Sequence, residues 1–111
     1  MPRVFIPQKV DKYDVSKAEE YGELIPLLED SLSPFNIMEM IYKFINAFRT
    51  FDFNPEKDFV CMTGNSLVLC WLSIALVLEF QKVKILIYDS RLENYYERTL
   101  ERPILIGSKN D

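Results

Sequence analysis

Hydrophobic residues recur along the chain in segments whose spacing alternates between that of strands and that of helices. Residues 4–6 form a short apolar run, which predicts a first strand that ends at Pro7. Residues 8–21 are mostly polar and indicate a loop with one helical turn. The next apolar run, residues 23–28, contains Pro26, which cannot donate to the hydrogen-bond ladder of a sheet. We therefore expect an edge strand or an irregular extended segment there.

Residues 34–50 have the pattern of a helix with one buried face. Ser33 offers a capping hydroxyl, and Pro34 suits the first position of a helix. Apolar side chains then follow at intervals of three and four residues, at Ile37, Met38, Ile41, Phe44, Ile45 and Phe48. This spacing predicts a helix over 34–50 that packs on a sheet through these side chains.

The middle of the chain predicts a strand, a helix and a second strand in succession. Residues 58–62 form a short apolar run bounded by turn residues, as is typical of a buried strand. Residues 66–81 are apolar on nearly all sides, and residues 83–88 are rich in β-branched side chains. Because a helix connects the two strands, we expect them to be parallel and to form one βαβ unit over 58–88.

A helix that is apolar all round needs more than one neighbour to cover it. The segment 66–81 should therefore pack centrally or at a subunit interface, with Leu67, Trp71 and Ile74 as candidate interface residues. The last segment, 92–102, fits two structures. Its alternating polarity favours an antiparallel edge strand, whereas the spacing of its glutamates and arginines would also suit ion pairs on a short helix.

These elements predict one α/β domain over residues 1–111. It would contain a mostly parallel sheet of four or five strands, a central βαβ unit at 58–88 and two main helices at 34–50 and 66–81. The longest apolar run spans 12 residues, at 67–78, and is shorter than the stretch of about 20 that crosses a membrane. We expect no membrane association, and without a signal-peptide pattern we expect a cytoplasmic protein.

Composition excludes several classes of function. The 13 Lys and Arg residues are outnumbered by 17 Asp and Glu, and the net charge of −4 makes a nucleic-acid partner unfavourable. The chain has no histidine, so it has no histidine-dependent triad or histidine base. Its two cysteines, Cys61 and Cys70, fall on a predicted strand and helix and are expected to be buried, inert thiols.

One turn offers a possible ligand site. Gly64 follows the strand at 58–62, and Asn65 or Ser66 could cap the next helix, leaving backbone N–H groups for an anion. Asp89 ends the following strand, where an acidic residue of a dinucleotide-binding fold would bind ribose hydroxyls. The alternative interpretation is purely structural: a glycine turn, a capping asparagine and an aspartate that ends a strand.

Parts of the sequence resemble small uncharacterised phage and mobile-element proteins. Residues 58–65 resemble a strand of these proteins that leads into Gly-Asp-Pro or Gly-Asn-Pro before an apolar helix. Residues 83–89, followed by Tyr95, resemble their strand that ends in Trp-Asp-Arg with a tyrosine soon after. Residues 21–24 resemble their Tyr-Gly-Glu segment. This chain departs from the pattern at three positions, with Ser66 for proline, Tyr88 for tryptophan and Ser90 for arginine.

The resemblance implies a viral or mobile-element origin. Together with the absence of a catalytic motif, it leads us to expect a small viral accessory protein that acts by non-covalent contact, as a homodimer or on a host protein. We expect no catalytic residues, no metal and no cofactor. The alternative is a Rossmann-like module that binds a nucleotide or another phosphoanion through the Gly64 turn and Asp89.

Overall fold

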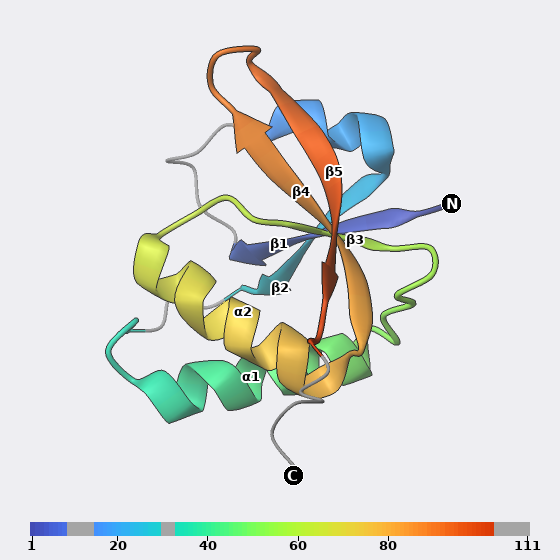
Figure 1. The fold of residues 1–111 in the computed structure, drawn as a ribbon. Coiled ribbons are helices and arrows are strands. Elements are labelled where there is room, and N and C mark those ends of the chain that lie inside the picture. The colour runs from blue at the N-terminus through green and yellow to red at the C-terminus, as the bar shows by residue number, and fades with distance from the viewer. Residues whose placement is uncertain (9–14, 30–32, 104–111) are drawn as a thin grey trace, which may run out of the picture.

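A sheet of five strands organises the protein, in a computed structural model that describes residues 1–8, 15–29 and 33–103. The strands are β1 (Arg3–Gln8), β2 (Glu23–Leu28), β3 (Phe59–Cys61), β4 (Lys82–Asp89) and β5 (Asn94–Glu101). Their order is β2-β1-β3-β4-β5, with the first four parallel and β5 antiparallel to β4 (Figure 1). The predicted α/β class with a mostly parallel sheet and two main helices is confirmed.

The two main helices lie side by side on one face of the sheet (Figure 1). They are α1 (Ile37–Thr50) and α2 (Ser66–Glu79), and a 3-10 helix, η1 (Ser16–Tyr21), covers part of the opposite face. Because successive residues of a strand point to opposite faces, Phe5 packs in the core under α1 and α2, whereas Val4 packs with Ala18 of η1. Each face of the sheet thus has its own apolar core.

The position of β2 accounts for its proline. Pro26 is paired in register with Ile6 of β1, and β2 has no second neighbour in the sheet. An edge strand can spare one donor without leaving a ladder incomplete. The expected edge strand is therefore confirmed, and β1 and β3 occupy the interior of the sheet.

The central βαβ unit has the expected parallel register. Val60 is paired with Ile85 and Cys61 with Leu86, and α2 connects the two strands. The helix begins at Ser66 as predicted but ends at Glu79, two residues earlier than expected. It ends there because Phe80 adopts an extended conformation, with φ −127° and ψ 145°, and leads directly into β4.

The first main helix begins later than predicted. Ser33 and Pro34 do not start α1; the Ser33 hydroxyl accepts a hydrogen bond from the N–H of Phe35 at 3.3 Å, and its carbonyl accepts one from Asn36 at 3.1 Å. These bonds close a turn, and α1 begins after it at Ile37. Serine followed by proline is a common start of a helix, but here the hydrogen bonds of Ser33 stabilise a separate turn before the helix.

The last segment forms a strand rather than a helix. β5 pairs with β4 over its whole length, with Leu100 opposite Val83 and Tyr96 opposite Ile87. These cross-strand apolar pairs stabilise the hairpin. Tyr95 is buried on the other face with Leu86, and it could not reach that core from an exposed helix.

Candidate functional site

The turn after β3 lies where parallel sheets commonly bind ligands. Gly64 has φ +153°, and a side chain there would come within 3.9 Å of Pro7 at the end of β1. β1 is followed in the chain by β2, its neighbour on one side, whereas the adjacent strand β3 is followed by β4, its neighbour on the other side, so the order of the strands reverses between β1 and β3. Such a switch point is the usual ligand crevice of an open α/β sheet.

Asn65 already occupies the start of α2. Its side-chain oxygen accepts hydrogen bonds from the N–H groups of Leu67 at 2.9 Å and Val68 at 3.3 Å. The predicted cap is confirmed, and two of the donors that an anion would use are satisfied within the chain. Ser66 is exposed beside them. A phosphate group would therefore have to displace the Asn65 side chain or bind beside it.

Asp89 lies further along the sheet edge and is engaged in its own turn. The last paired residue of β3, Cys61, is opposite Leu86, so Asp89 lies about 10 Å beyond it along β4. Its carboxylate accepts a hydrogen bond from the N–H of Arg91 at 2.8 Å and forms an ion pair with the guanidinium at 3.3 Å. The hydrogen bond from the Arg91 side chain lowers the pKa of this carboxyl.

Among the residues that the structure describes, no hydrogen bond joins Asp89 to the Gly64 turn. The turn residues 64–66 are consecutive at the start of α2, and the Asp89 carboxylate is bonded to Arg91 rather than to them. Whether these residues bind a ligand stays a prediction.

Polar side chains of Thr63, Tyr95 and Tyr21 form a partly buried cluster near the end of β3. The hydroxyls of Thr63 and Tyr95 are 3.0 Å apart, and the Tyr21 hydroxyl donates to the Tyr95 carbonyl at 3.1 Å. Cys61 is fully buried beside them, and burial raises the pKa values of both the Cys61 thiol and the Tyr95 hydroxyl. Both groups therefore stay protonated at neutral pH, which makes Cys61 a poor nucleophile.

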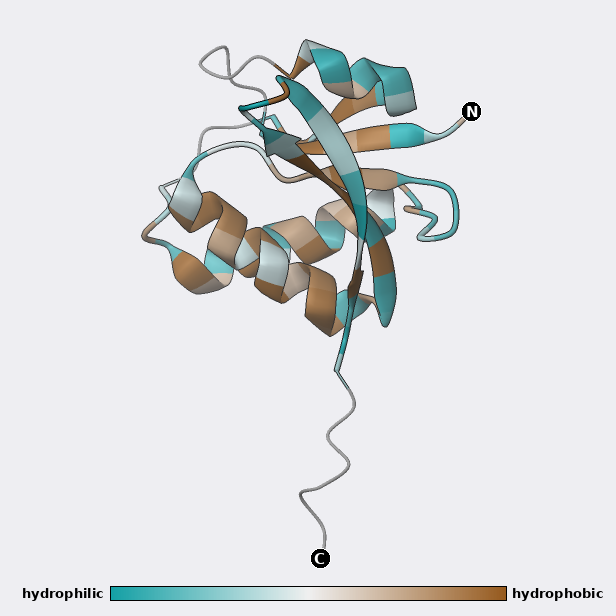
Figure 2. Ribbon diagram, turned by 45° about the horizontal axis from the view of Figure 1, so that its top comes forward, coloured by the Kyte–Doolittle hydropathy of each residue, from teal (hydrophilic) through white to brown (hydrophobic). Residues whose placement is uncertain are grey.

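The outward side of α1 and α2 carries the largest group of exposed apolar side chains. We call it the helix face, and define it by Phe35, Ile37, Met38, Tyr42, Leu67, Cys70, Trp71, Ile74 and Leu78. Phe35 is 78% exposed, Tyr42 59% and Leu78 63%. Figure 2 shows that hydrophobic residues occur along most of the length of both helices.

The apolar character of α2 is divided between two faces. Its inner face buries four residues against the sheet and α1: Val68, Leu72, Ala75 and Leu76. Its outer side carries Leu67, Trp71, Ile74 and Leu78, at intervals of four, three and four residues. The three predicted interface residues, Leu67, Trp71 and Ile74, therefore share one side of the helix. Leu67 and Ile74 are exposed, and Trp71 is half-buried.

Two contacts hold α1 and α2 together beside this face. The Trp71 indole donates to the carbonyl of Pro34 at 2.7 Å, near the start of α1. At the other end, Arg49 and Glu79 form a two-pronged ion pair with N–O distances of 2.8 and 2.9 Å. The two helices therefore run parallel. The hydrogen bond from Arg49 lowers the pKa of Glu79.

Three expectations about buried side chains prove wrong at this surface. Ile37 and Met38 were assigned to the buried side of α1, and Cys70 was assigned to the core; all three are exposed. The sheet and α2 cover only part of the apolar arc of α1, and its buried residues are Met40, Ile41, Phe44, Ala47 and Phe48. The sequence did contain one indication of this: the apolar residues of α1 cover a wider arc than a single neighbouring surface can bury.

A protein-family model described as phage Pam3 gp32-like protein matches residues 2–102 of the chain. The chain belongs to this family. The resemblance to small phage proteins is thereby confirmed for most of the sequence. Comparison with curated proteins gives no match, and neither does comparison with solved structures.

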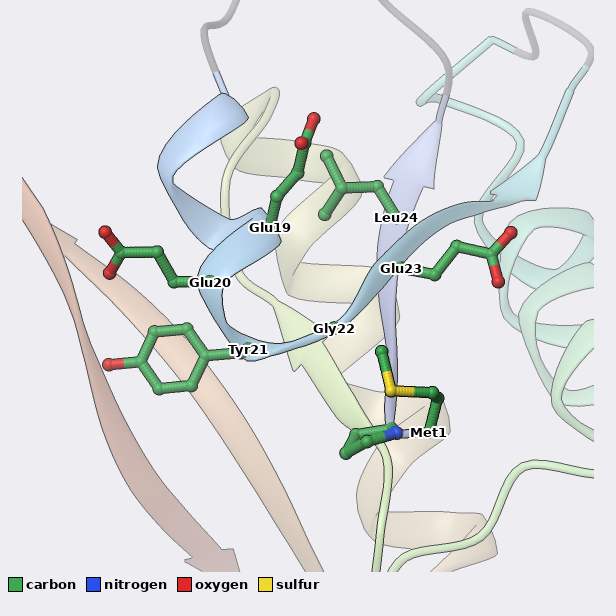
Figure 3. Close-up of a pocket in the computed structure, with 8 residues that line it drawn as sticks. Met1, Glu19, Glu20, Tyr21, Gly22, Glu23 and Leu24 are labelled. Atoms are coloured by element: carbon green, nitrogen blue, oxygen red, sulfur yellow. The ribbon is translucent and has the colours of Figure 1, made fainter.

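This phage protein also has an open acidic hollow beside η1. It has a volume of about 730 Å³ and is lined by Met1, Pro2, residues 19–23 and Leu24. Figure 3 shows that the carboxylates of Glu19, Glu20 and Glu23 point in different directions. Across residues 1–8, 15–29 and 33–103, no group of three His, Cys, Asp or Glu residues is arranged to hold a metal ion.

The helices in the described part of this phage protein are short compared with a membrane span. α2 is the most apolar of them, but it has only 14 residues. None of the helices in the described part of the chain is long and apolar enough to cross a bilayer.

Proposed function

We propose that this phage protein acts by non-covalent contact through the helix face and catalyses no reaction. The observation that carries the proposal is the exposed apolar area. At about 200 Å² for each large side chain, the exposed fractions amount to roughly 700 Å². That is more than the largest apolar patch of a typical monomer, about 300–600 Å², and such patches mark interaction sites.

The chemistry of the described residues supports contact rather than catalysis. The sequence contains no histidine. The buried thiol of Cys61 and hydroxyl of Tyr95 both have raised pKa values, so neither is prepared to act as a base or nucleophile near neutral pH. Asp89 is paired with Arg91. These observations offer an apolar surface for recognition and no group tuned for proton transfer.

A pair of matched variants tests the role of the helix face in the phage. Leu78 lies on the helix face and is 63% exposed, and Leu92 lies in the β4–β5 turn and is 62% exposed. The phage gene is replaced by versions encoding Leu78→Lys or Leu92→Lys and compared with a deletion for phage yield. We expect the Leu78→Lys phage to reproduce like the deletion and the Leu92→Lys phage like the wild type. If the deletion lowers the phage yield and the Leu78→Lys phage still gives the wild-type yield, the proposal is contradicted.

A phosphoanion site is the second candidate function, favoured by the position of the Gly64 turn at the switch point of the sheet. It would use Gly64, Asn65, Ser66 and Asp89. Calorimetric titration of the wild-type protein with a nucleoside triphosphate should then detect binding. The variants Gly64→Val and Asp89→Ala should each abolish this binding, and their circular dichroism spectra should show an intact fold. Absence of heat from the wild-type protein, or equal binding by both variants, would dismiss this candidate.

A further inference from the structure

We infer that the partner of the helix face is a second copy of this chain, with the helix faces of the two copies in contact and α2 of each copy beside a two-fold axis. This inference rests on the proposed function, because it names the partner of the same surface. It is carried by three features: the area of the helix face, the absence of charge on α2 from Ser66 to Leu78, and the order of the side chains along α2.

The area of the helix face matches the requirement of a dimer. Its exposed apolar side chains present roughly 700 Å², and a stable protein interface buries about 800 Å² on each partner. A two-fold interface uses the same patch on both copies. One patch of this size is therefore sufficient to form the apolar centre of a symmetric dimer, with polar residues at its rim.

The charges of the protein favour another apolar surface as partner. The whole chain carries a net charge of −4, yet α2 has no charged side chain from Ser66 to Leu78. Glu79, at the end of α2, is neutralised by its ion pair with Arg49 of α1. A strongly charged partner would find no complementary group on α2, whereas a second copy would bring an equally uncharged helix without like-charge repulsion.

The order of side chains on the outer side of α2 favours an antiparallel pair. Leu67 and Leu78 lie at the two ends of the row, and Trp71 and Ile74 lie between them. Their spacing of four, three and four residues is that of a two-helix seam. In an antiparallel pair, Leu67 of one copy lies opposite Leu78 of the other, and the large Trp71 lies opposite the smaller Ile74. Antiparallel helix dipoles also attract.

Sedimentation velocity on the full chain at tens of micromolar tests this inference. We expect the wild type and Leu92→Lys to sediment with twice the mass of one chain. Leu78→Lys should sediment with the mass of one chain and keep the wild-type circular dichroism spectrum. Ile74→Glu is a second variant for the same face, in case Leu78→Lys does not fold. A wild-type monomer, or dimers of both helix-face variants, would overturn the inference.

An apolar fluorescent dye, anilinonaphthalene sulfonate, separates failure of the dimer from failure of the proposed function. A wild-type dimer should leave the dye dark. A wild-type monomer that binds the dye, with binding lost in Leu78→Lys and kept in Leu92→Lys, would eliminate the second copy but retain the helix face as a contact surface for another protein. A monomer that leaves the dye dark would eliminate both proposals.

Discussion

Among the residues that the structure describes, Asp58 is the one buried polar or charged residue; it precedes β3 and is 2% exposed. Its carboxylate accepts hydrogen bonds from the backbone N–H of Arg3 at 3.1 Å, from the Arg3 guanidinium at 2.7 Å and from the N–H of Asn54 at 2.8 Å. The same guanidinium donates to the carbonyls of Phe51 and Asp52. This one ion pair therefore joins the start of β1 to the connection between α1 and β3.

Replacing Asp58 should destabilise the fold in a pH-dependent way. Burial alone would raise the pKa of Asp58, but the hydrogen bonds from Arg3 and Asn54 outweigh it and lower the pKa. The carboxylate therefore contributes its full stabilisation above its unfolded pKa of about 3.9 and loses it as the pH falls through the lower folded value. Asp58→Asn should cost about 3 kcal/mol at pH 7 in urea unfolding. The difference from wild type should shrink below about pH 4; a constant difference would contradict the assignment.

Two glycines with nearly the same φ angle should respond differently to replacement by alanine. Gly22 has φ +158° and Gly64 has φ +153°. A Cβ atom at Gly22 would overlap the carbonyl oxygen of Pro2, whereas at Gly64 the nearest atom is 3.9 Å away. We expect Gly22→Ala to lower the free energy of unfolding by at least about 2 kcal/mol and Gly64→Ala by about 1 kcal/mol, measured by urea denaturation. Equal losses would show that the clash with Pro2 has no role.

At the scale of elements, local patterns predicted most of the fold. The alternation of apolar runs and a helical period located both main helices and the strands at 4–6, 58–62 and 83–88, because each segment buries one contiguous set of side chains. For residues 23–28 and 92–102 a strand was one of two predicted alternatives, and the cap of α2 was expected to be Asn65 or Ser66; the structure has strands at both segments and the cap at Asn65. These features depend on residues near one another in sequence, so a single sequence contains the information they need.

The predictions that failed depend on contacts between residues that are far apart in the sequence. Periodicity shows that a side of α1 is apolar, but the position of α2 and the sheet determines which part of that side is covered. Met38 is exposed for this reason, and Cys70 faces outward on a helix that is apolar all round. The Arg3–Asp58 pair, 55 residues apart in sequence, had no local signal beyond an aspartate before a buried strand. For the candidate site, the turn at 64–66 could be predicted from the sequence. That Asp89 would bond to Arg91 and not to this turn could not be predicted.

The antiparallel arrangement of α2 can be tested by cross-linking. In a Cys70→Ser background, which leaves the buried Cys61 as the natural thiol, single variants Leu67→Cys and Leu78→Cys are oxidised separately and as a mixture. We expect a disulfide-linked dimer from the mixture and little from either variant alone, because residue 67 of one copy lies opposite residue 78 of the other. Efficient linking of each variant to itself would indicate parallel helices instead. Denaturing electrophoresis without reductant provides the readout.

At the scale of the whole molecule, the layers of the fold are covered unequally. η1 and the Tyr95 side chain cover one face of the sheet, and α1 and α2 cover the other (Figure 1). The helix layer has an apolar outer side with nothing packed on it among the described residues. A third layer supplied by another molecule would complete the arrangement, since apolar surface gains stability when it leaves water. The proposed function rests on this uncovered side of the helix layer.

Native mass spectrometry of the gently purified full chain is the most direct test that this phage protein acts by contact with a second copy. One spectrum reports both the number of chains in the assembly and any small molecule they retain. We predict a mass of two chains with no adduct. A single chain that carries an adduct of nucleotide mass would contradict this account and assign the function to the turn at Gly64.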